Sequence, residues 1–227
     1  SEFLQRFRLA AQGKHKGKQP PDRLRQRVQT YFDPLPFFYA PLEQQATDTT
    51  KYPLSAVTQR PMAMYHSWDS QNAWLRQIHA HNYLFVNART ARLAGIDDGD
   101  WIWVESQWGK VRCMARHSEA VEPGTVWTWN AIGKAAGAWN LTPDANESKL
   151  GFLLNHVISE ELPAGQARIS NSDPITGQAA WYDVRVRISK VSPGETAETS
   201  PQFEPLKPYP GQEERRSLWA YLARGGK

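Results

Sequence analysis

Six histidines and one cysteine are the nitrogen and sulfur ligands that this chain could offer a metal. His79 and His81 are two residues apart, a spacing that would place both imidazoles on one face of a strand. Imidazole nitrogens are common metal ligands, but no third ligand stands at a diagnostic spacing. Cys113 is the only cysteine, which excludes a disulfide framework within the chain and a cysteine-based zinc site or iron–sulfur cluster built from this chain alone. We therefore expect no metal held by this chain alone.

Motifs of nucleophilic catalysis and of phosphate binding are also missing. The sequence has no Gly-x-Ser-x-Gly elbow, no Gly-x-Gly-x-x-Gly and no Gly-Lys-Ser/Thr loop, although a Ser/His/Asp triad stays open. A strand at 51–60 ends in the polar residues Thr58, Gln59 and Arg60, and the run 61–72 after it is rich in side chains that donate and accept. The run 130–138 is small and glycine-containing, so its backbone can approach a ligand or another chain closely. By itself the sequence predicts a binding domain rather than a complete catalyst.

The stretch 87–126 gives the clearest local structure. Asn87 can cap a short helix, and Gly95 can end that helix in the left-handed conformation. An acidic turn at 97–100 leads into a strand at 101–107, whose even-numbered residues face one way and whose odd-numbered residues face the other. We expect a compact β-rich unit here.

Alternating patterns predict further strands. In residues 181–191, Val184, Val186 and Ile188 alternate with polar side chains, which is typical of a half-buried strand. A helical turn is expected at 72–78. The other strands that we expect are at 51–60, 83–86, 110–117, 125–129 and 167–171.

The positive charge is concentrated at the N-terminus. Residues 1–30 carry eight Lys or Arg against two acidic residues, a balance of +6, so the rest of the chain contributes −2 to the formal net charge of +4. A nucleic-acid-binding arm is one interpretation. We favour the alternative of a solvated connector, because the aromatic residues follow the charge instead of accompanying it.

Composition sets the remaining bounds. The 227 residues are 40% apolar, enough for one substantial core, and ten tryptophans suit β-rich packing. No apolar run approaches a membrane span and no secretory segment is present, so we expect a reduced, cytoplasmic location. Ser1 is not an initiator Met, so we expect a processed chain or part of a longer one. Three prolines at 31–50 predict an extended strap on this chain's body or on a missing one.

Several short motifs stand in one order between Tyr52 and Val191. Thr-Gln-Arg follows a strand that opens with Tyr-Pro-Leu; after it come VNARTARLAGIDDGDWIWV, Glu-Pro-Gly, Asn155 and Asp-Pro-Ile-Thr-Gly. This ordered set, over about 140 of the 227 residues, resembles the C-terminal domain of the molybdopterin-dinucleotide oxidoreductases, the dimethyl-sulfoxide-reductase family. The family has Thr-Gly-Arg in the first motif, so Gln59 stands in place of its glycine.

The resemblance implies a mainly β fold, a double-psi β-barrel of about six strands with short helices, flanked by an irregular N-terminal arm and a C-terminal tail. It divides the chain into a connecting arm at 1–50, a molybdopterin-dinucleotide-binding barrel at 51–191 and a Pro-rich tail at 192–227. In the family this domain closes over a molybdenum cofactor with two pyranopterin guanine dinucleotides. The molybdenum ligand and any iron–sulfur cluster come from domains absent here.

The resemblance also assigns cofactor contacts residue by residue. Arg60 could offer a bidentate fork to an anionic oxygen, although it could instead pair with a carboxylate at the barrel rim. Asn155 matches the family's asparagine that reads the pterin edge, and Asn140 is its rival for that role. The family's lysine after the last turn falls near Asp183, so that contact is lost here. The residues implied to contact the cofactor are Thr58, Gln59, Arg60, His66, Ser67, Asn140, Asn155 and Tyr182.

The function implied is the cofactor-holding portion of a molybdenum oxidoreductase catalytic subunit. The overall pattern is most similar to the subgroup that handles sulfur oxyanions, the sulfite dehydrogenases and polysulfide or thiosulfate reductases. The partners implied are the remaining domains of the same polypeptide and, in some relatives, an iron–sulfur electron-transfer subunit together with a membrane anchor subunit. One alternative is a stand-alone binding module whose basic arm engages nucleic acid or an acidic protein. Another is an assembly protein whose barrel only packs against a partner.

Overall fold

The computed structural model describes residues 2–65, 68–69, 72–79, 81–130, 132, 150–164, 167–179, 184–195 and 202–203. The helices are α1 (Glu2–Ala11), α2 (Asp22–Tyr31), α3 (Leu42–Ala46), α4 (Ala73–Arg76), α5 (Ala88–Leu93) and the 3₁₀ helix η3 (Leu154–Val157). The strands are β1 (Leu54–Gln59), β2 (Leu84–Val86), β3 (Trp101–Glu105), β4 (Gly109–His117), β5 (Thr125–Trp129), β6 (Glu161–Ala164), β7 (Ala167–Ser170), β8 (Val184–Lys190) and β9 (Gln202–Phe203).

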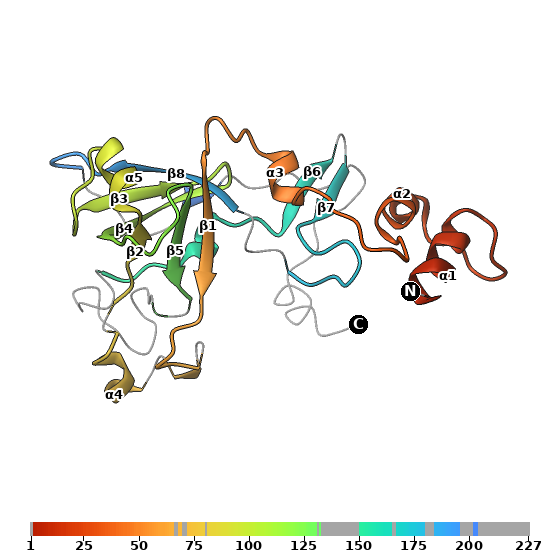
Figure 1. Cartoon of the computed structure of the whole chain (residues 1–227), viewed down its shortest axis with the longest axis horizontal. Helices are drawn as coiled ribbons and strands as arrows, with labels where there is room; N and C mark the ends of the chain where they lie inside the picture. Colours follow the sequence, from red (N-terminus) through yellow and green to blue (C-terminus); the bar gives the residue numbers. More distant parts are fainter. Residues whose placement is uncertain are drawn as a thin grey trace, which may run out of the picture.

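Six strands close into a mixed barrel (Figure 1). Their order is β2-β5-β1-β8-β3-β4, and β4 pairs back onto β2 to complete the ring. Strand β9 pairs with the first two residues of β4. The pairs β1–β5 and β2–β4 are parallel and the other barrel pairs are antiparallel. Closure removes the exposed strand edges that a short open sheet would leave. The predicted six-stranded barrel with short helices is confirmed.

Alternation along the strands builds one core inside the barrel. On β3, Ile102 and Val104 are fully buried, whereas Trp101 and Trp103 are half-buried on the outside. The guanidinium of Arg112 lies over the Trp101 ring at 4.1 Å, so this tryptophan belongs to the barrel surface. The buried residues of this core are Leu54, Ala56, Leu84, Val86, Ala91, Ile96, Ile102, Val104, Val111, Cys113, Ala115, Val126, Phe152, Leu154, Val157, Val184 and Val186.

The helix and turn predicted before β3 form as expected. The Asn87 side chain accepts from the backbone N–H of Arg89 at 2.9 Å and caps α5. Gly95, with φ of +67°, follows the helix in the left-handed conformation. This short helix places Ala91 and Ile96 against the barrel core.

The N-terminal arm is more regular than expected. Gly13 and Gly17 lie with positive φ in the connection between α1 and α2. They let the chain reverse, so that Ala11 packs against Val28 and Phe32 in a small separate core. In Figure 1 this helix pair lies apart from the barrel, beyond α3, β6 and β7.

The strap predicted at 31–50 lies on this chain's own body. The Tyr39 hydroxyl donates to Asp173 at 2.8 Å, and the indole N–H of Trp108 donates to Glu43 of α3 at 2.9 Å. Helix α3 begins directly after Pro41, where a missing backbone N–H costs nothing. The strap therefore joins the β6–β7 hairpin, which lies outside the barrel, to the turn after β3.

Candidate functional site

The Thr-Gln-Arg motif lies where two parallel strands of the barrel end. Gln59 of β1 pairs with Trp129 of β5, and the backbone N–H of Asn130 donates to the Gln59 carbonyl oxygen at 2.8 Å. Thr58 is half-buried and Gln59 is exposed. The barrel therefore fixes the backbone of this motif and leaves its polar side chains available.

Arg60 follows β1 and is exposed. No carboxylate among the described residues pairs with its guanidinium, which disfavours the interpretation of a rim ion pair. A guanidinium presents its donors in a planar fork that suits the paired oxygens of a phosphate or carboxylate. Arg60 can therefore bind an anionic group of a ligand.

Asn155 lies on η3, a short turn held by the barrel core. Leu154 and Val157 on either side of it are buried, and the Ser106 hydroxyl donates to the Val157 carbonyl oxygen at 2.6 Å. These contacts turn the Asn155 amide outward, where it is exposed. An amide can donate and accept together, so Asn155 can read a ligand that does both.

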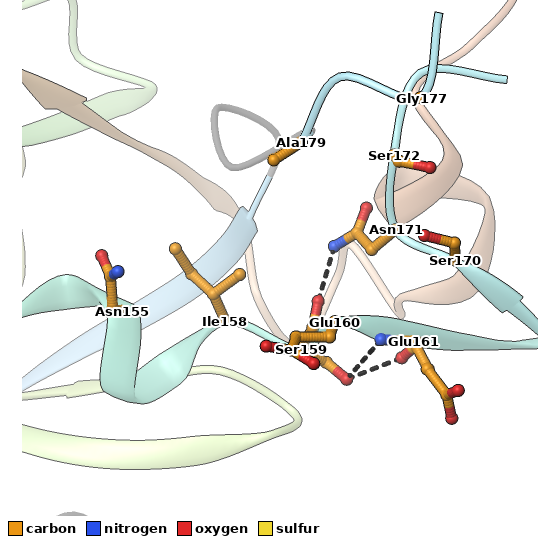
Figure 2. Close-up of a pocket in the computed structure, with 10 residues that line it drawn as sticks. All are labelled: Asn155, Ile158, Ser159, Glu160, Glu161, Ser170, Asn171, Ser172, Gly177 and Ala179. Atoms are coloured by element: carbon orange, nitrogen blue, oxygen red, sulfur yellow. Dashed lines mark hydrogen bonds between the residues drawn. The ribbon is translucent and has the colours of Figure 1, made fainter. Parts of the chain in front are cut away.

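A cavity of about 600 Å³ opens beside η3, between it and the β6–β7 hairpin (Figure 2). Pockets of this volume hold ligands of cofactor size. Its described lining is hydroxyl- and amide-rich, and it includes no lysine or arginine. The lining residues are Asn155, Ile158, Ser159, Glu160, Glu161, Ser170, Asn171, Ser172, Gly177 and Ala179.

The Asp-Pro-Ile-Thr-Gly turn closes one side of this region. Burial raises the pKa of Asp173, but hydrogen bonds from the backbone of Thr176, from the Tyr39 hydroxyl, from the Thr176 hydroxyl and from the backbone of Ile175 outweigh it and leave the pKa below its ordinary value. Gly177, which lines the cavity, has φ of +74°. The turn thus holds an ionised carboxyl group whose oxygens are already engaged by the chain.

The predicted residues fall into two places. Thr58, Gln59 and Arg60 share the end of β1, whereas Asn155 lines the cavity, which none of those three lines among the described residues. Asn82 links the two regions, because its amide donates to the carbonyl oxygens of Trp129 at 2.8 Å and Phe152 at 3.5 Å. His66, Ser67, Asn140 and Tyr182 lie outside the described residues.

Asn155 is the one lining residue that was predicted as a contact, and two of the residues that were not predicted are bonded to each other. Asn171 lines the cavity, and Glu43 lies behind it, 1% exposed and hydrogen-bonded to the Asn171 amide at 3.4 Å. They are 128 residues apart, so no local pattern could pair them. A glutamate inside an otherwise Pro- and aromatic-rich strap was the one available signal.

The two closely spaced histidines have separate neighbours. His79 lies 5.5 Å from the Trp129 ring and His81 lies 4.5 Å from the Tyr83 ring, and burial lowers the pKa of His81. Within the described part of the chain, no cluster of three or more His, Cys, Asp or Glu could hold a metal ion. A search of the same residues finds no helix of the length and apolarity that a bilayer crossing needs.

Comparisons with known proteins identify the family of the domain. Residues 54–163 match the family described as "Molydopterin dinucleotide binding domain". The chain is 70% identical over 226 residues to a sulfite dehydrogenase subunit of Allochromatium vinosum, an alignment that covers 98% of this chain and 23% of that protein. It is 33% identical over 78 residues to the thiosulfate reductase molybdopterin-containing subunit PhsA of Salmonella typhimurium, covering 34% of this chain and 10% of that protein.

A solved structure with the same fold is acetylene hydratase from Pelobacter acetylenicus. The TM-score is 0.53 at 22% sequence identity, over 70% of this chain and 22% of that chain. The chain thus spans about a quarter, or less, of the length of the proteins that it matches.

Proposed function

We infer that this chain, which belongs to the Molydopterin dinucleotide binding domain family, forms part of a molybdenum oxidoreductase. We propose that Thr58, Gln59, Arg60 and Asn155 bind the cofactor of that enzyme. One observation carries the proposal. The family match spans both the end of β1 and η3, and at these two places the structure leaves the Arg60 guanidinium and the Asn155 amide outward and available. His66, Ser67, Asn140 and Tyr182 stay predicted contacts.

The two places suit different parts of a dinucleotide. Arg60 offers a cation with paired donors, which fits the phosphate oxygens. Asn155 borders a cavity without a lysine or arginine in its described lining, which fits an uncharged polar ring. When bound, the cofactor's metal supplies two-electron redox and oxygen-atom chemistry. The residues of this chain bind and orient the organic part.

The finer identity of cofactor and substrate belongs to the same proposal. We propose the form with two molybdopterin guanine dinucleotides, shared with other domains of a larger catalytic subunit, since the matched relatives are longer proteins. A sulfur oxyanion is the substrate that we propose, because one relative is named as part of a sulfite dehydrogenase and another as part of a thiosulfate reductase. A cytoplasmic location and the two further subunits, iron–sulfur and membrane anchor, stay predictions, as do the boundaries 1–50, 51–191 and 192–227.

The test measures bound cofactor in variants of the full-length natural polypeptide. Arg60→Ala and Asn155→Ala should each weaken retention by about tenfold, the effect of losing one hydrogen bond to a charged or buried group. The readout is pterin fluorescence after acid release, per folded polypeptide. Asn140→Ala, measured beside them, decides which asparagine contacts the cofactor.

Arg89→Ala is the matched control, because Arg89 is an exposed arginine on α5. It should retain wild-type cofactor content. Wild-type content in both Arg60→Ala and Asn155→Ala would show that these residues do not hold the cofactor. Absence of any pterin from the wild-type polypeptide would reject the function itself.

A further inference from the structure

Asn171 is a buried amide whose orientation is forced by its neighbours. It follows β7 and only 8% of it is exposed. Its Nδ2 donates to the Ser159 carbonyl oxygen at 3.0 Å and to Oε2 of Glu43 at 3.4 Å. A carbonyl oxygen can only accept, and the Glu43 oxygen serves as an acceptor here. The NH₂ group of the amide must therefore face these two atoms, and its oxygen must face the other way.

Oδ1 of Asn171 is buried and has no hydrogen bond to any described residue. Figure 2 shows it directed away from Ser159, into the space between Ala179 and Ser172 on the cavity side. Buried acceptors in folded proteins are nearly always paired, because leaving one unpaired is unfavourable. The amide thus presents an acceptor that a ligand with a hydrogen-bond donor would satisfy.

Glu43 holds the amide in this orientation. It is 1% exposed, and its Oε1 accepts from the indole N–H of Trp108 at 2.9 Å and from the Thr47 hydroxyl at 3.1 Å. Its other oxygen faces the Asn171 amide. The carboxyl group is therefore fixed from α3 and from the turn after β3, and it cannot rotate without breaking these bonds. Glu43 acts through Asn171 and does not line the cavity itself.

The cavity selects against an anion. Glu160 and Glu161 are in its lining, and its described lining includes no lysine or arginine. The nearby guanidinium of Arg27 reaches Ser172, but it is engaged by the carbonyl oxygens of Ser172 at 3.2 Å and Asp173 at 3.4 Å. Serine hydroxyls and amide groups supply the remaining polarity. The ligand that fits is uncharged and donates hydrogen bonds.

We propose that this cavity binds the 2-amino-4-oxopyrimidine edge of a pterin or guanine ring. Asn171 Oδ1 accepts from the exocyclic amino group of the ring, Asn155 lies at the opposite side, and Glu43 is a positioning residue for Asn171. The inference rests on the proposed function, since that ring edge occurs in both halves of a pterin guanine dinucleotide. Beyond that function, Asn171 Oδ1 is the atom that accepts from the ring, and Glu43 holds it in place.

Calorimetric titration of the cofactor-free, full-length polypeptide tests the ring chemistry. The probes are guanosine monophosphate and 6-hydroxymethylpterin, each compared with its counterpart that lacks the 2-amino group, inosine monophosphate and 6-hydroxymethyllumazine. We expect the amino-bearing member of at least one pair to bind about tenfold more tightly, as one buried hydrogen bond implies. Which pair shows the difference identifies the guanine or the pterin as the occupant.

Variants connect that preference to the two residues. Asn171→Ala should reduce binding of the preferred probe to the level of its amino-lacking counterpart. Glu43→Gln should act in the same direction, because a glutamine amide cannot accept from Trp108, Thr47 and Asn171 together. Glu119→Gln makes the same change on an exposed turn and should bind the probe like wild type.

Two results would overturn the inference. One is equal binding, or no binding, of both members of both probe pairs by the wild-type polypeptide, which needs no variant to fold. The other is an unchanged amino-group preference in Asn171→Ala. If the polypeptide nevertheless carries its cofactor as purified, the proposed function stands and only the reading by Asn171 fails.

Discussion

The amide of Asn82 donates to the carbonyl oxygen of Trp129 at 2.8 Å, in a position where Asn82 is fully buried. The same nitrogen lies 3.5 Å from the carbonyl oxygen of Phe152. One side chain before β2 therefore ties the end of β5, next to the Thr-Gln-Arg motif, to the segment that leads into η3. The two halves of the candidate site are held together from inside the protein.

Asn82→Leu removes this tie. We expect the free energy of unfolding to fall by about 1–3 kcal/mol, because two carbonyl oxygens lose a buried donor. Denaturant unfolding measures it. Gln44→Leu makes a similar amide-to-aliphatic change on the exposed side of α3 and should alter stability by less than about 0.5 kcal/mol. Equal stability of the Asn82 variant and wild type would contradict the linking role.

Leu84 tests whether the barrel core supplies the stability of this domain. Leu84 on β2 is fully buried, so Leu84→Ala should lower the free energy of unfolding by about 2–5 kcal/mol through lost burial and the cavity that remains. Leu93→Ala is the matched control, because Leu93 is 82% exposed on α5. Chemical unfolding followed by tryptophan fluorescence compares them. Similar losses in both variants would argue against a packed barrel interior.

Acid should weaken the docking of the strap on Asp173. Because the pKa of Asp173 in the folded chain lies below its ordinary value, its contribution to stability is present above about pH 4 and disappears as the pH falls through the lowered pKa. Tyr39→Phe removes one donor to this carboxyl group and raises that pKa. The stability difference between Tyr39→Phe and wild type should therefore be largest near neutral pH and shrink below about pH 4.

Urea unfolding at a series of pH values checks this dependence. Asp173→Asn provides the reference, because it removes the titrating group and should abolish the extra pH dependence. A difference between Tyr39→Phe and wild type that stays constant from neutral pH to about pH 3 would mean that Asp173 does not depend on the hydroxyl.

The basic arm should not bind nucleic acid at physiological salt. Several of its arginines already have partners, with Arg6 bonded to Glu2, Arg8 to Asp33 and Arg27 to the turn after β7. Fluorescence anisotropy with labelled single- and double-stranded DNA should therefore show no binding near about 150 mM salt. Micromolar affinity with a steep salt dependence would instead support a nucleic-acid arm.

Particular helices and strands show how much of the fold can be predicted from the sequence. Alternation predicted β3 and β8, because a strand with one buried face repeats every two residues. The cap at Asn87 and the stop at Gly95 predicted α5 for equally local reasons. The two helices of the arm were not predicted, because glycines such as Gly13 and Gly17 can either interrupt one helix or form the turn between two.

The cavity region could not be predicted in this way. Its main contacts join residues far apart in the chain, such as Glu43 with Asn171 and Arg27 with Ser172. Neither residue type nor spacing predicts such a pair, because the two residues meet only once the strap has folded onto the β6–β7 hairpin. Asn155 was found through the order of motifs, but the amide that completes its surroundings was not.

A structure of the full-length natural polypeptide with its cofactor would test the central claim most directly. The claim is that this domain holds the organic part of the cofactor from the end of β1 and from η3. We expect the Arg60 guanidinium within about 3 Å of a cofactor oxygen and the Asn155 amide within hydrogen-bond distance of a cofactor ring. A cofactor bound elsewhere, with Arg60 and Asn155 facing solvent or another domain, would contradict it.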